Sequence, residues 1–276
     1  MSINQKLNNN SHINNELILF SNELADISQK ILEQYFRKSN LQDFEKDDKS
    51  PITIADTEVE SALRAEIEKK YPAHTIIGEE FSDLDGISNY KWYIDPIDGT
   101  SSFIMGKPIF TTLIALTYDS EPIFGLINQP ITKERWQGGE VYQTNFNGIN
   151  VSTKKTTKLE EAILATTSPY LFDEQQLHSF NKLRKQTKYQ KYGGVFLGGD
   201  AYLYAMLASG HIDIILESNL KAHDFLALVP IIKSAGGTIT DWQGKEITEK
   251  SSGNILACST KELHHQVIEI INTQEE

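Results

Sequence analysis

The sequence predicts a mixed α/β protein whose N-terminal half is α+β and whose C-terminal half is α/β. Apolar residues recur with the period of an amphipathic helix in two segments, residues 16–38 and 53–71. Strand-like runs with turn residues between them then fill residues 91–152. Beyond Lys158, strand and helix patterns alternate, which is typical of an α/β arrangement.

The first half is predicted to contain two helices followed by an antiparallel meander. Pro72 is expected to end the second helix, because proline cannot continue it. The segment between the helices, LQDFEKDDKSP, is expected to be a charged loop in which Lys49 lies either near a site or on the surface. A short strand in HTIIGEEF leads to an acidic turn. Four strands with short connections are then expected: KWYID, FTTLIALTYD, EPIFGLINQP and GEVYQTNFNGINVS.

The second half is predicted to alternate between strands and helices. The expected strands are EAILATTS, YQKYGG, IDIILES and NILACS, and the expected helices are DEQQLHSFNKLRKQT, DAYLYAMLASG, HDFLALVPIIKSAGG and KELHHQVIEIINT. A change in composition at VSTKKTTKLEE suggests a boundary. We therefore divide the chain into a mobile polar N-terminus (1–14), an α+β half (15–155) and an α/β half (156–276), which are expected to pack together and share one site.

Charge and composition exclude several classes of partner. The formal net charge of −12 disfavours binding to nucleic acid or to an anionic membrane surface, and it favours cations. No apolar run is long enough to cross a bilayer, and the Asn-rich N-terminus lacks the features of a signal peptide, so a cytoplasmic protein is expected. The single cysteine, Cys258, lies in the apolar run NILACS and is assigned no chemical role.

The segment WYIDPIDGTSSF holds the main candidate for a metal site. Pro96 removes a backbone donor at the end of a strand, so the chain leaves its ladder there and projects Asp95 and Asp98 from one rigid turn. No cation lies within this segment, and two adjacent carboxylates repel each other unless a metal ion neutralises them. An acidic, oxygen-rich, cysteine-free site suits Mg²⁺.

The residues that follow resemble the first turn of a short helix. Gly99, Thr100, Ser101 and Ser102 precede an apolar pair, and the free N–H groups at such a terminus bind phosphate oxygens. A metal beside an anion cradle suits phosphoryl chemistry. However, D-P-x-D-G is also favourable turn chemistry without any function.

Two further segments contain acidic residues that can also be explained without a function. Glu79 and Glu80 end an apolar strand in IIGEE, where a solvated strand end is the simpler account. In ESNLKAHDF, a strand delivers Glu217, and a turn leads to Asp224 at the start of a helix, where Asp224 could be a plain N-cap.

Three separated motifs, GEE, WYIDPIDGTSSF and KAHDFLALVPIIKSAGG, follow the order and rough spacing found in the inositol monophosphatase family of metal-dependent, lithium-sensitive phosphatases. The earlier segment SPITIADTEVE also resembles the T-x-x-D element of that family. The resemblance runs from about residue 15 to the C-terminus. It implies a layered α/β/α/β/α sandwich, a homodimer, and hydrolysis of a small phosphate monoester.

The resemblance also implies a metal site for two or three Mg²⁺ ions. Glu79, Asp95 and the main-chain carbonyl of Ile97 would hold one ion. Asp95, Asp98 and Asp224 would hold a second, and Glu79 could reach a third through water.

Catalytic and phosphate-binding roles are carried over from the same resemblance. Asp56 would accept a hydrogen bond from Thr100, whose hydroxyl would orient the attacking water, and Glu79 would support this chemistry through the metal. Backbone N–H groups at Gly99 and Thr100, with Ser101 beside them, would bind the phosphate.

Within the family, the sequence favours the bacterial histidinol-phosphate phosphatase branch. The supporting segments are DGTSSF, where many inositol phosphatases have Asn in place of Ser102, together with GLINQPITKERWQGG and GGDAYLY. Histidinol phosphate carries an ammonium and an imidazole, which Asp200 and Glu217 could hold. Asp200 could instead be a helix N-cap, and Glu217 resembles a residue that contacts ring hydroxyls in inositol phosphatases. Inositol 1-phosphate or a broad range of small phosphate esters therefore remain alternatives.

One residue departs from the family pattern, and one rival belongs to another class. His223 stands where the family commonly has Trp, which affects the expected substrate preference more than the metal site. A non-catalytic metal- or phosphate-binding regulatory protein would be expected to lack at least one metal carboxylate. All five candidate acids are present: Asp56, Glu79, Asp95, Asp98 and Asp224.

Overall fold

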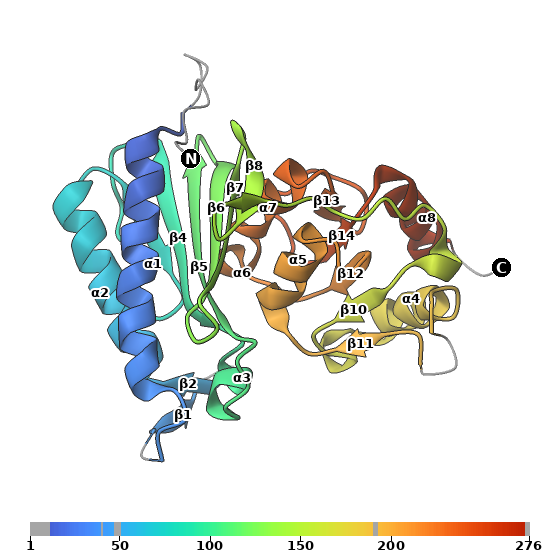
Figure 1. Ribbon diagram of the computed structural model, residues 1–276, viewed down its shortest axis with the longest axis horizontal. Helices are drawn as coiled ribbons and strands as arrows, with labels where there is room; N and C mark the ends of the chain where they lie inside the picture. The colour runs from blue at the N-terminus through green and yellow to red at the C-terminus, as the bar shows by residue number, and fades with distance from the viewer. Residues whose placement is uncertain (1–11, 40, 47–50, 190–192, 274–276) are drawn as a thin grey trace.

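A computed structural model describes residues 12–39, 41–46, 51–189 and 193–273. Their elements form five layers in the order helix, sheet, helix, sheet, helix, as Figure 1 shows from left to right. This is the layered arrangement that the sequence predicted. Residues 1–11 of the predicted mobile N-terminus lie outside the described residues.

Two long helices form the first layer. Helix α1 (Asn15–Tyr35) begins after Asn14, whose side chain accepts a hydrogen bond from Leu17 N at 2.9 Å. Helix α2 (Ile54–Lys70) begins after Thr53. Their apolar faces pack on the first sheet around buried Trp92.

The first sheet has seven strands, and their spatial order is the same as their sequence order. Strand β3 is parallel to β4, and every other pair is antiparallel, so the predicted meander is confirmed. A two-stranded hairpin, β1 (Asp43–Glu45) and β2 (Pro51–Thr53), and the short helix α3 (Thr100–Ile104) lie at one end of the sheet. The seven strands are β3 (Thr75–Gly78), β4 (Tyr90–Asp98), β5 (Thr111–Tyr118), β6 (Glu121–Gln129), β7 (Glu134–Gly139), β8 (Tyr142–Phe146) and β9 (Ile149–Asn150).

The middle layer consists of three helices, and their side chains share one core with both sheets. These helices are α5 (Asp200–Ala208), α6 (Ala222–Phe225) and α7 (Leu228–Ser234). A Cβ on Gly125 of β6 would lie 1.8 Å from the carbonyl oxygen of Ala227, which joins α6 to α7. Only glycine permits this close approach, which holds α6 against the first sheet.

The second sheet is mixed and is covered on its outer face by α4 (Glu174–Arg184) and α8 (Lys261–Asn272). Strands β11 and β10 and strands β10 and β12 are parallel, whereas β14 is antiparallel to both β12 and β13. The spatial order is β11 (Phe196–Leu197), β10 (Leu164–Thr166), β12 (Ile214–Glu217), β14 (Ile255–Cys258) and β13 (Thr238–Asp241).

Several short elements differ from the prediction. The charged loop contains the β1–β2 hairpin, and strands β7 and β13 occupy segments that were not predicted as strands. The strand expected in YQKYGG is wrong for its described residues, and the strand lies instead at Phe196–Leu197; residues 190–192 lie outside the described residues. One predicted helix is divided into α6 and α7. The missed strands are two to six residues long and lack the apolar run that marked the predicted strands of similar length, so their pairing partners determine them.

No helix in the described part of the chain is long and apolar enough to span a membrane.

Candidate active site

A cavity of about 140 Å³ is lined by residues from the end of β4, the start of α3, the start of α5 and helix α6. Most of the predicted site residues line it: Glu79, Asp95, Ile97, Asp98, Gly99, Thr100, Asp200, Glu217 and Asp224. A larger hollow of about 280 Å³ lies beside α1 and β8, and apolar and amide side chains such as Ile18 and Gln143 line it. No carboxylate is among the described residues that line this larger hollow, so the smaller cavity is the candidate site.

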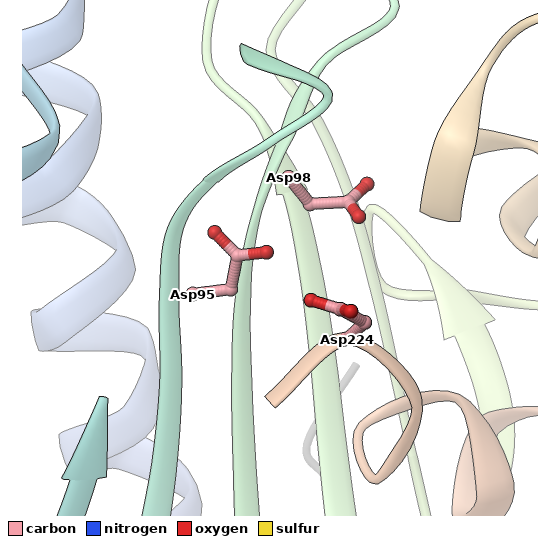
Figure 2. A group of neighbouring side chains, drawn as sticks. All are labelled: Asp95, Asp98 and Asp224. Atoms are coloured by element: carbon pink, nitrogen blue, oxygen red, sulfur yellow. The ribbon is translucent and has the colours of Figure 1, made fainter. Parts of the chain in front are cut away.

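Three aspartates converge in this cavity. Asp95, Asp98 and Asp224 each offer an oxygen within 4.8 Å of the others, and Figure 2 shows their side chains pointing toward one another. The structure therefore brings Asp224 to the two acids of the quoted motif from about 126 residues further along the chain.

A bulge at the end of β4 presents two of these acids. The pairing with β5 shifts between Asp95 and Asp98, where β4 has one more residue than its partner. Thr112 Oγ1 donates to the carbonyl of Pro96 at 2.8 Å, and Ile97 N donates to Asp95 Oδ1 at 3.0 Å. These two hydrogen bonds hold the turn at the carbonyl of Pro96 and at the N–H of Ile97.

Asp98 and Asp224 are oriented by helix starts. Ala201 N, in the first turn of α5, donates to Asp98 Oδ2 at 2.7 Å. Asp224 is the third residue of α6, and its Oδ2 accepts from Lys221 N at 2.7 Å. The alternative in which Asp224 is a plain N-cap is therefore wrong, because Lys221 occupies that position. His223 Nε2 lies 3.4 Å from Asp224 Oδ1.

Glu79 lies at the edge of this group, and a lysine that the sequence analysis did not select engages it. Lys46 Nζ contacts Glu79 Oε1 and Glu80 Oε1, each at 2.7 Å. Burial lowers the pKa of Lys46, but its hydrogen bonds to the two glutamates outweigh this and raise the pKa above its usual value. Nothing in the sequence distinguishes Lys46 from the other charges of its loop; Lys49 lies outside the described residues.

The predicted catalytic threonine lies between two oxygen atoms. Thr100 Oγ1 is 3.0 Å from the carbonyl oxygen of Ile97 and 3.5 Å from Asp56 Oδ1. Asp56 is fixed by the capping box of α2, where its Oδ2 accepts from Thr53 N at 2.7 Å and from Thr53 Oγ1 at 2.6 Å. The carbonyl of Ile97 is thus the nearer partner of the Thr100 hydroxyl.

The expected phosphate-binding turn begins helix α3. Gly99 is its N-cap and has φ +83°, a conformation that favours glycine. Among the described residues, no acceptor receives a hydrogen bond from the N–H groups of Thr100 and Ser101. These donors therefore remain free for a ligand, while the side chain of Ser101 is exposed and does not line the cavity.

Asp200 is not a helix cap. Gly199 occupies the N-cap position of α5, and Asp200 follows it with φ +46°, which is unusual for a residue other than glycine. A Cβ on Gly99 would lie 2.7 Å from Asp200 Oδ2, so the carboxylate lies directly beside the turn at Gly99. This backbone conformation places the acid in the cavity.

Glu217 ends strand β12 and is 4% exposed. Its Oε1 accepts from Thr167 N and its Oε2 accepts from Tyr204 OH, both at 2.9 Å. Tyr204 was not among the predicted site residues, although its position one helical turn after Asp200 places both residues on the same side of α5. Glu217 is therefore rigidly oriented, and each of its oxygens already has one protein donor.

A family model described as Inositol monophosphatase family matches residues 13–276. The chain belongs to the inositol monophosphatase family. Members of this family are phosphoric monoester hydrolases, and so is this protein.

Named relatives and a solved structure agree with this membership. The chain is 46% identical over 257 residues to the bifunctional phosphatase IMPL2, chloroplastic, of Arabidopsis thaliana, covering 90% of this chain and 72% of that protein. It is 32% identical to a histidinol-phosphatase of Chlorobaculum parvum, covering 85% and 89% respectively. A solved inositol monophosphatase from Zymomonas mobilis has 37% identity and a TM-score of 0.83, covering 94% of this chain and 98% of that one.

In this phosphatase, burial is the main reason why the carboxyl groups of the site have raised pKa values. Burial and the neighbouring Glu79 raise the pKa of Asp95 well above its usual range, and burial and Asp200 do the same for Asp98. Burial also raises the pKa of Asp200 to about 7 and that of Asp56 to about 6. Several carboxylates that repel one another in a buried cavity form a site that could hold a metal ion.

We expect the stability of the metal-free phosphatase to fall as pH rises. An acid with a raised folded-state pKa binds its proton more tightly when folded, so its contribution is present below the unfolded pKa of about 3.9 and is lost as pH rises through the folded pKa. For Asp200 that loss is complete only above about 7. Mg²⁺ should therefore raise the melting temperature more at pH 7.5 than at pH 5, by roughly 2–4 °C for each kcal/mol of coupling.

Differential scanning fluorimetry of EDTA-treated protein, with and without MgCl₂ at matched ionic strength, measures this difference. An equal Mg²⁺ effect at both pH values would contradict the expectation.

Proposed function

We propose that this phosphatase hydrolyses histidinol phosphate to histidinol and inorganic phosphate with Mg²⁺ as cofactor. The observation that carries the proposal is the convergence of three carboxylates, one buried and two half-buried, beside a helix start with free N–H groups. Two additional acids, half-buried Asp200 and buried Glu217, line the same cavity.

The donor set supports Mg²⁺ as the metal. Asp95, Asp98 and Asp224 offer only carboxylate oxygens, and Glu79 and the carbonyl of Ile97 lie at the edge of the same cavity. We assign these five residues as the metal ligands of a site for two or three ions. When bound, Mg²⁺ supplies positive charge against the phosphate and lowers the pKa of water.

The protein residues then orient the reactants. The N–H groups of Gly99, Thr100 and Ser101 would bind phosphate oxygens, because a helix start attracts anions. The Thr100 hydroxyl, held between Asp56 and the Ile97 carbonyl, would fix the direction of the attacking water. A bond forms between the water oxygen and phosphorus as the bond to the ester oxygen breaks. The attacking water loses one proton and the departing ester oxygen gains one, so the products are the alcohol and inorganic phosphate.

Replacing Asp95 by Asn should lower kcat by roughly 100-fold or more, because one of the central charges that hold the metal is lost. The fold should survive, since the Asn side chain can still accept from Ile97 N, and the metal-free variant should be as stable as the parent or more so because repulsion is relieved. Phosphate release at saturating Mg²⁺ and the melting temperature in EDTA measure both effects.

Asp85→Asn, an exposed acid, is the matched control. Full Mg²⁺-dependent turnover by the Asp95 variant would refute the assignment.

Excess negative charge in the cavity supports a cationic substrate. Beyond the candidate metal ligands, the cavity holds Asp200 next to Gly99 and Glu217 at the end of β12. A neutral polyol phosphate offers these acids no opposite charge, whereas the ammonium of histidinol phosphate does. The resemblance to proteins named histidinol-phosphatase supports the same substrate.

Inositol 1-phosphate, or a broad range of small phosphate esters, is the alternative within the family. It is favoured by the fact that both oxygens of Glu217 already accept protein hydrogen bonds, so this residue is less free to pair with a cation. A non-catalytic metal- or phosphate-binding role would not explain why the hydroxyl of Thr100 is oriented.

The test compares phosphate release from histidinol phosphate, inositol 1-phosphate, fructose 1,6-bisphosphate and 3′-phosphoadenosine 5′-phosphate, with Mg²⁺ and with EDTA. We expect Asp200→Asn to lower kcat/KM for histidinol phosphate about tenfold, equivalent to about 1.4 kcal/mol, and to leave inositol 1-phosphate unchanged. Asparagine tolerates the positive φ of this position, so the backbone should be kept. A preference for inositol 1-phosphate, or an equal loss for both substrates, would reject the proposed substrate.

The proposal includes a homodimer in the cytoplasm. Support for a dimer comes from the family resemblance and from exposed apolar side chains on the second half, such as Tyr170, Phe196 and Leu197. Light scattering after size exclusion should give a mass twice that of one chain, and Phe196→Ser should shift the equilibrium toward the monomer. A monomer at micromolar concentration would contradict this part.

A further inference from the structure

A buried ion pair on α2 lies behind the turn that carries Glu79. Glu60 is completely buried and Arg64, one helical turn later, is 8% exposed. Arg64 Nε donates to Glu60 Oε1 at 2.7 Å. Neither residue lines the cavity, so a role in direct contact with substrate does not explain this pair.

Both members of the pair bind the backbone that follows Glu79. Glu80 N donates to Glu60 Oε2 at 2.7 Å, and Phe81 N donates to Glu60 Oε1 at 3.2 Å. The two outer nitrogens of Arg64 donate to the carbonyls of Ser82 at 3.1 Å and Phe81 at 3.0 Å. Four charge-assisted hydrogen bonds thus fix three consecutive residues.

The residue before Glu79 is also in contact with Glu60. A Cβ on Gly78 would lie 2.0 Å from Glu60 Oε1, so the strand end passes directly over the Glu60 carboxylate. Glu60 therefore touches the chain on both sides of Glu79. Since the backbone is fixed before and after it, the direction in which the Glu79 side chain leaves the chain is fixed as well.

We infer that Glu60 and Arg64 are positioning residues that hold Glu79 in the orientation needed for metal binding. The inference rests on the proposed role of Glu79 as a metal ligand. Without these anchors, Glu79 would keep its ion pair with Lys46, but its backbone would no longer fix the direction of its carboxylate against the repulsion from Asp95. Holding it in place before the ion arrives removes that cost from metal binding, as hydrogen-bond partners of metal ligands commonly do.

Two variants test the inference in the full chain. Arg64→Lys keeps the charge beside Glu60 but loses the planar fork that reaches two carbonyls. Glu60→Gln keeps one acceptor oxygen, but it places an NH2 group where the other oxygen accepted a backbone N–H. It also leaves Arg64 without its counter-charge, so it is the more disruptive change. If Glu60→Gln does not fold, Arg64→Lys still decides the question.

The primary measurement is the dissociation constant of Mg²⁺ in isothermal titration calorimetry of metal-depleted protein without substrate. We expect it to rise roughly tenfold or more in each folded variant. Amide hydrogen exchange at Glu80 and Phe81 should be faster, and kcat at saturating Mg²⁺ should return to within about twofold of the parent value because the reacting groups are unchanged.

Two further variants separate the possible failures. Glu66→Gln, on the exposed side of the same helix, should leave Mg²⁺ binding unchanged. Glu79→Gln should weaken it; if it does not, Glu79 is not a metal ligand and both the assignment and the inference fail. If Glu79→Gln weakens Mg²⁺ binding but Arg64→Lys lowers only the melting temperature, the ion pair is a stabiliser of the fold and the inference alone is overturned.

Discussion

Repulsion among closely spaced carboxylates is the constraint on which the rest of this site depends. Asp95, Asp98 and Asp224 lie within 4.8 Å of one another at the junction of the first sheet and the middle helices. Each accepts one backbone N–H, from Ile97, Ala201 and Lys221 respectively. These N–H donors orient the three carboxylates. The partial positive charge of an N–H group does not neutralise the full negative charge of a carboxylate, so the group could bind a cation.

The order of the layers brings these acids together. Strand β4 carries two of them through a bulge, while α6 is held against the sheet by the contact between Gly125 and Ala227. Lys46 enters from the β1–β2 hairpin and binds Glu79 and Glu80. This ammonium offsets part of the negative charge at one edge of the cavity, and His223 lies 3.4 Å from Asp224 at its centre.

Around the central acids, the protein uses different means to hold the acids next to them. Asp200 depends on an uncommon backbone conformation, Glu217 on two hydrogen-bond donors, and Glu79 on the ion pair beneath its turn. Strained backbone at a cavity is a typical sign of function, because the surrounding structure must maintain it. Under the proposed function, the acids beyond the candidate metal ligands would distinguish a cationic substrate from a neutral one.

Much of this could be predicted from the sequence. Helical period identified α1 and α2 to within three residues at each end, and the alternation after Lys158 indicated the second half. The two aspartates of WYIDPIDGTSSF were recognisable because Pro96 cannot donate a ladder hydrogen bond. The strand was expected to leave its ladder there, but β4 instead accommodates Pro96 in a bulge and pairs with β5 again at Asp98. The correctly predicted features depend on residues that are close together in the sequence, so the sequence is enough to predict them.

Other features could be decided only by the tertiary structure. Strands β7, β11 and β13 are two to six residues long and form because a neighbouring strand offers hydrogen bonds. Lys46 resembles any other charge of its loop until the hairpin brings it to Glu79, and Asp200 is a plausible cap until its φ of +46° is known. The sequence by itself determined which acids were available and which helices would form. Only the packed layers decided which acids meet, because contacts between residues distant along the chain depend on how the layers pack.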